Sequence, residues 1–170
     1  MANPHSWIDV TSAPIIVWTC PEIGDRVDGA AYVTDVYEAW HKWLLAHPRP
    51  FVAIIDTSHM KSFPGAKTRK SLAEGEQLTA RLETTYNKGN AFVVTNPVMR
   101  SIMTAVYWLS SPHYPHSFFG TFADALDWAG NQLVGAGIAL PTSLPMPHPP
   151  PPLLDRAPTR NVIRQASGWK

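Results

Sequence analysis

The residue types best suited to chemistry follow directly on the apolar run of residues 51–55, where an acid, two hydroxyls and an imidazole stand in succession at residues 56–59. The carboxyl ends of strands in open α/β sheets are where ligands usually bind. A loop to Gly65 leads into a helical pattern whose first backbone N–H groups could receive an anion. This arrangement predicts a binding or switch loop. The competing interpretation is that Asp56 caps its own turn and the serines merely form the loop. The candidate binding residues are Asp56, Ser58, His59, Ser62, Lys67, Arg69 and Arg100.

Catalysis and metal binding are not predicted. A serine triad needs a nucleophile on a strained turn, a base and an orienting acid, yet the sequence contains no Gly-x-Ser-x-Gly. Asp56, Ser58 and His59 lie too close together in the sequence to be interpreted as such a triad. His113 and His116 make only two ligands, whereas a catalytic zinc needs at least three. We therefore expect a non-enzymatic protein without a metal or cofactor.

Composition favours a globular chain with a weak electrostatic field at its surface. Hydrophobic residues make up 45% of the 170 residues, which is enough for an ordinary core. The net charge of +1, with 16% charged residues, gives little attraction for nucleic acid or an acidic membrane surface. The single cysteine, Cys20, can form neither an internal disulfide nor a cysteine-rich zinc site. No run approaches the roughly 18 apolar residues of a membrane span, and residues 1–7 lack the features of a secretory signal, so a cytoplasmic location is expected.

Strand and helix patterns alternate along the chain and must position the candidate residues. The expected strands are residues 14–19, 51–55, 91–95 and 116–119. The expected helices are 34–47, 67–87, 97–109 and one beginning after Thr121, with residues 31–33 either a further short strand or the approach to the first helix. Strands joined through helices become parallel neighbours. The sequence therefore predicts an α/β fold, a mixed sheet of four or five strands with about four helices, in which the runs ending at Ile55 and Val94 lie side by side.

The C-terminal part differs in composition. Of the 17 prolines, eight lie between Pro141 and Pro158. Such a segment favours polyproline II and acts as a semi-rigid spacer. We expect a domain at residues 1–140 and a proline-rich tail at 141–170, largely disordered or docked in extended form. The candidate docking residues of the tail are Arg160, Val162, Ile163, Arg164 and Trp169.

The order of elements over residues 12–137 resembles the STAS-type domain of bacterial anti-sigma-factor antagonists. The best local match is residues 51–58, which are similar to the central strand of that family, ending there in Asp-Leu-Ser. Residues 62–66 (Ser-Phe-Pro-Gly-Ala) stand where that family has Asp-Ser-Ser-Gly, so its regulatory phosphorylated serine has no match here. The resemblance implies a regulatory protein that binds another protein.

Three functions remain open from the sequence. The leading prediction is a non-enzymatic regulatory or scaffold domain that binds a protein through the Asp56 loop and the adjacent helix, with the tail as a docking segment. The second is a domain, possessing at most weak enzymatic activity, that binds a small molecule or lipid in a pocket of several hundred Å³ at the carboxyl ends of the strands. The third is a homo-oligomeric assembly component, in which Trp43 and Trp108 point outward as interface anchors; packing of these aromatic residues in the core is the competing interpretation.

Overall fold

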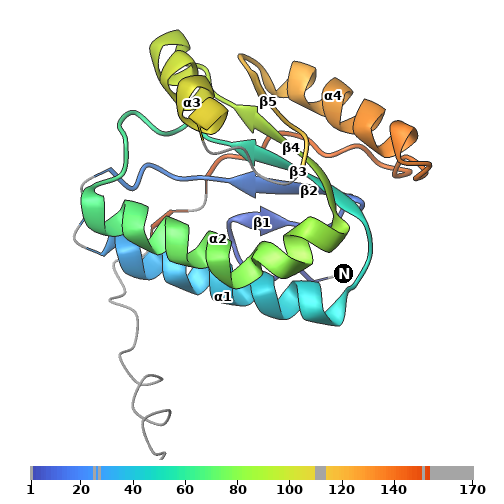
Figure 1. The fold of residues 1–170 in the computed structure, drawn as a ribbon, viewed down its shortest axis with the longest axis horizontal. Helices are drawn as coiled ribbons and strands as arrows, with labels where there is room; N and C mark the ends of the chain where they lie inside the picture. The colour runs from blue at the N-terminus through green and yellow to red at the C-terminus, as the bar shows by residue number, and fades with distance from the viewer. Residues whose placement is uncertain (1, 25, 27, 110–113, 151, 154–170) are drawn as a thin grey trace, which may run out of the picture.

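The computed structural model describes residues 2–24, 26, 28–109, 114–150 and 152–153, with only the backbone of residues 105–109. The elements follow in the order β1 (Ile8–Asp9), β2 (Ile15–Thr19), α1 (Gly29–Ala46), β3 (Phe51–Asp56), α2 (Ala66–Tyr86), β4 (Asn87–Val93), α3 (Pro97–Leu109), β5 (His116–Phe119) and α4 (Phe122–Gly135). Figure 1 shows these elements around one sheet. The tail residues from 154 onward, including all five predicted docking residues, lie outside the described part of the chain.

The strands form one mixed sheet in the order β1-β2-β3-β4-β5. β1 pairs antiparallel with β2, whereas β2, β3, β4 and β5 run parallel. Ile54 pairs with Ala91 and Ile55 with Phe92, so the two apolar runs are neighbours as predicted. The predicted α/β fold with a mixed sheet is confirmed.

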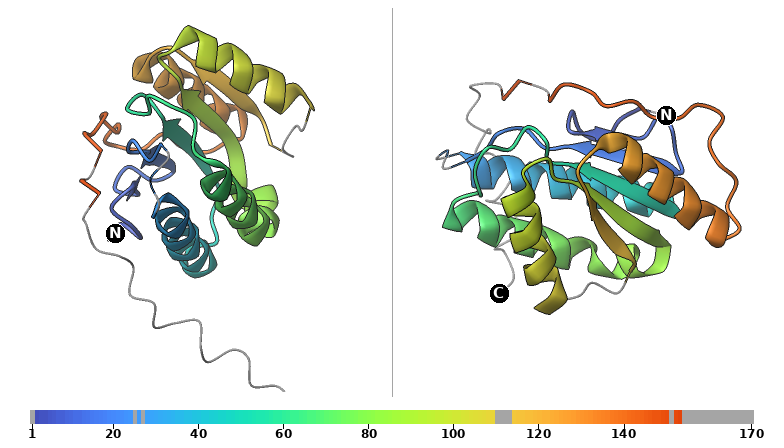
Figure 2. Two further views of the ribbon diagram at one scale, coloured as in Figure 1. Left: turned by 90° about the vertical axis from the view of Figure 1, so that its left-hand side faces the viewer. Right: turned by 90° about the horizontal axis from the view of Figure 1, so that it is seen from above.

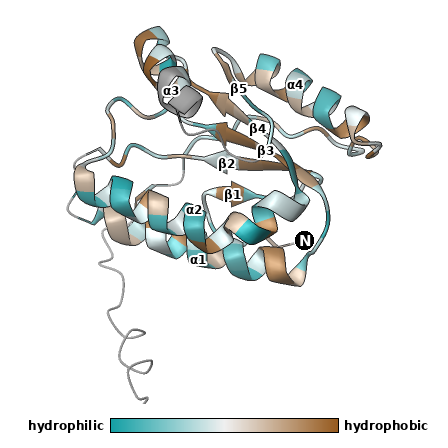
Figure 3. Ribbon diagram, in the orientation of Figure 1, coloured by the Kyte–Doolittle hydropathy of each residue, from teal (hydrophilic) through white to brown (hydrophobic). Residues whose placement is uncertain are grey.

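Successive side chains of a central strand point to opposite faces of the sheet, and both faces are covered, which explains why these strands are apolar throughout. Val52 and Ile54 pack against α4 in one core cluster, while Phe51 and Ala53 belong to the cluster beneath α1. A strand covered on both faces has no solvated side, which accounts for the continuous hydrophobic run. Figure 3 shows the strands as the most hydrophobic part of the ribbon and α2 as largely hydrophilic.

The two helices α1 and α2 lie against each other on one face of the sheet, and α4 covers the other face (Figures 1 and 2). Gly75 explains how α2 comes so close to α1: a Cβ built there would lie 2.3 Å from the ring of Tyr37. A second close contact joins Gly29 to Thr68, where a Cβ would lie 2.9 Å from the threonine hydroxyl. Small residues at these two points therefore fix the spacing of the helical layer.

Helix α3 lies on the same side of the sheet as α2 but over its other part. Met99 and Met103 pack on Phe92 and Val94 of the β4 segment, together with Ile55. Figure 2 shows α3 separated from α2, with the sheet between them as a floor. This separation leaves room for the cavity described below.

Two helix and strand boundaries differ from the sequence prediction. Helix α1 begins at Gly29, whereas the predicted helix begins at residue 34, so Thr34 lies inside α1 and its hydroxyl donates to the carbonyl of Ala30 at 3.0 Å. Strand β4 begins at Asn87, whereas the predicted strand begins at residue 91, because the chain passes from α2 into the strand without a loop. Gly89 is needed there because a Cβ would lie 2.7 Å from the ring of Trp128.

The described residues beyond α4 run in extended form along the β1 side of the sheet (Figure 2). Pro145 is buried, and the imidazole Nε2 of His148 lies 3.3 Å from Asp9 Oδ2. Leu153 packs against the cluster that contains Trp7. These contacts hold Pro145, His148 and Leu153 on the domain surface. Among the described residues, none of the helices has the length and apolarity required to cross a membrane.

Candidate functional site

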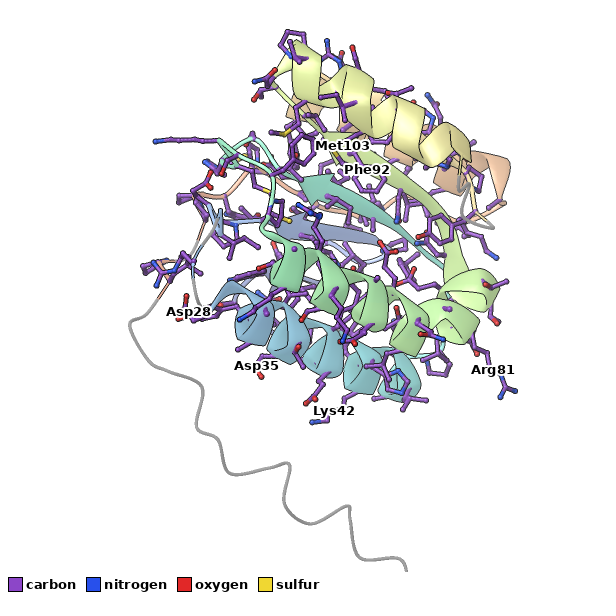
Figure 4. All side chains as sticks on the ribbon, turned by 60° about the vertical axis from the view of Figure 1, so that its left-hand side comes forward. Asp28, Asp35, Lys42, Arg81, Phe92 and Met103 are labelled. Atoms are coloured by element: carbon purple, nitrogen blue, oxygen red, sulfur yellow. The ribbon has the colours of Figure 1, made fainter. Side chains whose placement is uncertain are left out.

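A cavity of about 430 Å³ lies over the sheet between α2 and α3. Its floor comes from β2, β3 and β4, and its sides come from α1, α2, α3 and the loop after β3. Most of its surface is apolar. The aromatic lining residues are Trp7, Trp18, Tyr37, Phe63, Phe92 and Tyr114. Figure 4 shows Phe92 and Met103 near each other beneath α3, whereas Asp35, Lys42 and Arg81 project from the outer surface of α1 and α2.

The inner face of α2 supplies most of the polar lining. Leu72, Glu76, Thr79 and Glu83 recur at steps of four, three and four residues, which places them on one side of an α-helix. Thr79 is buried, and its hydroxyl donates to the carbonyl of Gly75 at 3.2 Å. Two carboxyl groups therefore remain as the strongly polar groups of this helix face.

Glu83 is the centre of a hydrogen-bond network that joins three elements. Trp40 Nε1 on α1 donates to Glu83 Oε1 at 2.7 Å, and Asn87 Nδ2 on β4 donates to Glu83 Oε2 at 2.6 Å. Asn87 Nδ2 also donates to Asn90 Oδ1 at 2.7 Å. Burial raises the pKa of Glu83; the two donated hydrogen bonds oppose that shift, and the charge of Glu76 adds to it. The network fixes one polar end of the cavity.

Glu76 lies about two helical turns before Glu83, on the same face of α2, and also lines the cavity. Part of its side chain faces solvent, but burial still raises the pKa of its carboxyl group. Within the described residues, its carboxylate has no hydrogen bond or ion pair. Glu76 is therefore free to interact with a molecule in the cavity.

Asp56 lies at the carboxyl end of β3, where its side chain caps the local turn. Asp56 is 2% exposed, and its Oδ1 accepts a hydrogen bond from the backbone N–H of Ser58 at 2.9 Å. By the alternation of β3, its side chain is on the α4 side of the sheet, opposite to the cavity. The same loop does reach the cavity through Thr57 and Met60. His59 is half-buried in this loop and is not one of the lining residues.

The predicted residues of the following loop and helices do not form one cluster. The hydroxyl of Ser62 donates to Glu22 Oε1 at 3.1 Å, and Arg100 Nη1 donates to the carbonyl of Val94 at 3.1 Å. Lys67 is exposed in the first turn of α2. Arg69 lines the cavity, where its Nη1 donates to the carbonyl of Pro64 at 2.8 Å. Of the seven candidate residues in the domain, only Arg69 lines the cavity.

Sequence reasoning missed the two glutamates. The helix predicted over residues 67–87 was expected to contact a protein partner beside the Asp56 loop, and neither glutamate was among the candidate residues. The available signal was the spacing of Leu72, Glu76, Thr79 and Glu83. That spacing marks one helix face but does not say which face is turned toward the sheet.

Burial, with a contribution from the charge of Asp56, raises the pKa of Cys20 to about 12, so the thiol stays protonated at neutral pH.

Trp40 and Trp43 are buried, at 1% and 7% exposed, and stack on each other. They are core residues, and the side chain of Trp108 lies outside the described part of the structure. The described residues contain no group of three or more histidine, cysteine, aspartate or glutamate side chains that could together hold a metal ion.

Comparison of the chain with protein-family models, with curated proteins and with solved structures found no match. The resemblance to STAS-type domains therefore stays a prediction, and the candidate site depends on the geometry of the cavity.

Proposed function

We propose that this domain binds a small, largely apolar molecule in the cavity between α2, α3 and the sheet. The observation that carries the proposal is the cavity itself, with a volume of about 430 Å³ and a mainly apolar lining. Ligand sites for small molecules typically measure about 300–1,000 Å³ and combine hydrophobic walls with a few polar groups. The small-molecule alternative of the sequence prediction is therefore the one that the geometry favours, at a position over the sheet face.

The lining supports binding of an apolar body. Phe92 and Leu72 offer flat and branched apolar surface, and Met99 and Met103 offer flexible thioethers that can adapt to a ligand. Each Å² of apolar ligand surface removed from water contributes about 25 cal/mol. Burial of a compact hydrophobic ligand is thus a sufficient driving force without any catalytic group.

Protein binding through the Asp56 loop also remains a proposal. The exposed side chains of that region, Ser62 and Lys67, could contact a partner, but the buried Asp56 could not do so without leaving its bond to Ser58. Homo-oligomer formation likewise stays a proposal, but Trp43, one of its two predicted anchors, is buried.

The proposed site is tested with N-phenyl-1-naphthylamine, an uncharged dye whose fluorescence rises in apolar surroundings. Met103 lines the cavity, so Met103→Trp should fill part of it and weaken dye binding about tenfold, or 1.4 kcal/mol. Thr104→Trp, one residue along α3 at an exposed position, is the control and should bind as the wild type does. Absence of saturable dye binding to the wild type, or equal binding by both variants, would contradict the proposed function.

A further inference from the structure

The charged groups around the cavity are unequally distributed. The ionisable lining residues among those described are Cys20, Tyr37, Arg69, Glu76, Glu83 and Tyr114. Arg69 is the one cation of this set, and its guanidinium is bonded to the carbonyl of Pro64 at the loop end. Glu76 and Glu83 lie further along α2, on the same helix face. The part of the cavity away from Arg69 is therefore acidic.

Both carboxyl groups retain capacity to accept hydrogen bonds from a ligand. An ionised carboxylate offers about four lone-pair sites, and Glu83 uses two of them for Trp40 and Asn87. Glu76 has no partner among the described residues. A donor or cation that enters the cavity would thus meet one unpaired carboxylate and one that is firmly held in position.

Aromatic rings line the same space. Trp18, Tyr37 and Phe92 come from β2, α1 and β4, on the faces that surround the inner side of α2. Cations are attracted to the faces of such rings, and aromatic walls are a recurring feature of sites that bind organic ammonium groups. The aromatic lining is an observation independent of the two carboxyl groups, and it favours the same charge.

We propose that the ligand of this cavity is an organic cation, an apolar or aromatic body with an ammonium group, whose charge is held by Glu76 and Glu83 on α2. This inference rests on the proposed function, because it names the chemistry of the molecule that the cavity binds. The apolar body lies on Phe92 and Met103, and the ammonium group lies on the α2 side. A fatty acid would place a like charge beside these carboxylates and is disfavoured.

The pH dependence follows from the same arrangement. The carboxyl groups attract a cation only when they are ionised, and burial raises the pKa of both. Affinity for an ammonium compound should therefore fall as the pH is lowered through their pKa values, while affinity for an uncharged analogue should change little. The groups that face them are Trp40 and Tyr37 on α1, Asn87 and Asn90 on β4, and Arg69 on α2 itself.

The experiment compares three probes that share a ten-carbon chain: decylammonium, decanol and decanoate. Calorimetric titration of the full chain at pH 7 should give the tightest binding for decylammonium, about tenfold tighter than decanol, and the weakest for decanoate. Glu76→Gln should abolish most of the preference for decylammonium over decanol. The control is Glu74→Gln on the outer face of α2, where Glu74 is exposed beside Lys70, and it should keep the preference.

Each outcome bears on one of the two proposals. Binding of decanol or decanoate as tightly as decylammonium, or an unchanged preference in Glu76→Gln, overturns the cationic ligand while the cavity keeps its binding function. Absence of binding for all three chains and for N-phenyl-1-naphthylamine overturns the proposed function and this inference with it. Glu76 makes no bond among the described residues, so its substitution should leave folding intact, which circular dichroism checks.

Discussion

The bond between Trp40 and Glu83 should be one of the strongest single side-chain contacts in the domain. Trp40 is 1% exposed, so water cannot replace Glu83 as the acceptor for its indole N–H. A hydrogen bond to a charged group contributes about 1.5–3 kcal/mol, and a buried donor left without a partner costs about 1–3 kcal/mol. Glu83→Leu should therefore lower the free energy of unfolding by about 2 kcal/mol or more, mainly through the orphaned indole.

A double-mutant cycle separates this bond from the packing of the two side chains. Trp40→Phe removes the donor and part of the ring that stacks on Trp43. In the double variant no orphaned donor remains, so its loss should be smaller than the sum of the two single losses. The expected coupling is about 2 kcal/mol at pH 7.

The pH dependence of this cycle gives a second check. Because burial raises the folded-state pKa of Glu83 above its ordinary value of 4.5, the folded state holds the proton more tightly than the unfolded state. The contribution of this group to stability is then largest below pH 4.5 and falls as the pH rises toward the folded pKa. In Glu83→Leu, this fall in stability with rising pH should be absent. The coupling itself should be smaller at low pH, because a protonated carboxyl makes a weaker bond to the indole.

Urea unfolding followed by far-ultraviolet circular dichroism is the suitable assay, since the loss of a tryptophan alters fluorescence directly. The reasoning would be refuted by a coupling below about 0.5 kcal/mol at pH 7, a value typical of independent sites. It would equally be refuted by a stability of Glu83→Leu that changes with pH in the same way as the wild type.

Further predictions concern the helices and the thiol. Gly75→Ala should lower stability by about 1–3 kcal/mol in thermal unfolding, because its Cβ would lie 2.3 Å from the ring of Tyr37. The control is Gly130→Ala, whose Cβ would have its nearest contact at 3.6 Å and which should be neutral or stabilising by up to about 1 kcal/mol. Equal effects of the two substitutions would contradict this account. Cys20 should react with dithionitrobenzoate at pH 8 much more slowly in the native protein than after unfolding, because burial raises the pKa of its thiol to about 12; equally rapid reaction of the native protein would contradict this. Thr121→Ala should cost about 0.5–2 kcal/mol in urea unfolding by removing the N-cap of α4, and an unchanged midpoint would refute that role.

Much of the fold could be predicted because local chemistry determines it. The apolar run of β3 carries enough burial on both faces to mark a central strand, and its pairing with β4 follows from the helix that connects them. Thr121 was recognisable as a cap because its hydroxyl can reach the N–H of Asp124, and it accepts that bond at 3.2 Å. Such signals lie within a few residues of the feature they specify.

The rest depends on contacts between distant parts of the chain. Gly75 reads as a weak point in a helix until Tyr37, which lies on another helix, is known to press against it. Glu83 reads as a solvated charge until Trp40 is placed beside it. β1 has only two residues and leaves almost no periodicity to detect. The cavity was expected at the strand ends, but its position is determined by the separation of α2 from α3, which sequence patterns do not encode.

The close crossing at Gly75 has a consequence for how a ligand could reach the cavity. With Tyr37 held against the glycine, α1 and α2 cannot slide past each other and must behave as one stiff wall. The opposite side is built differently, since α3 rests on the sheet through Met99 and Met103. Unbranched, flexible side chains let a helix shift at small cost. Exchange of a bound molecule with solvent should therefore follow the breathing of α3, and its rate should respond to the size of those two methionines.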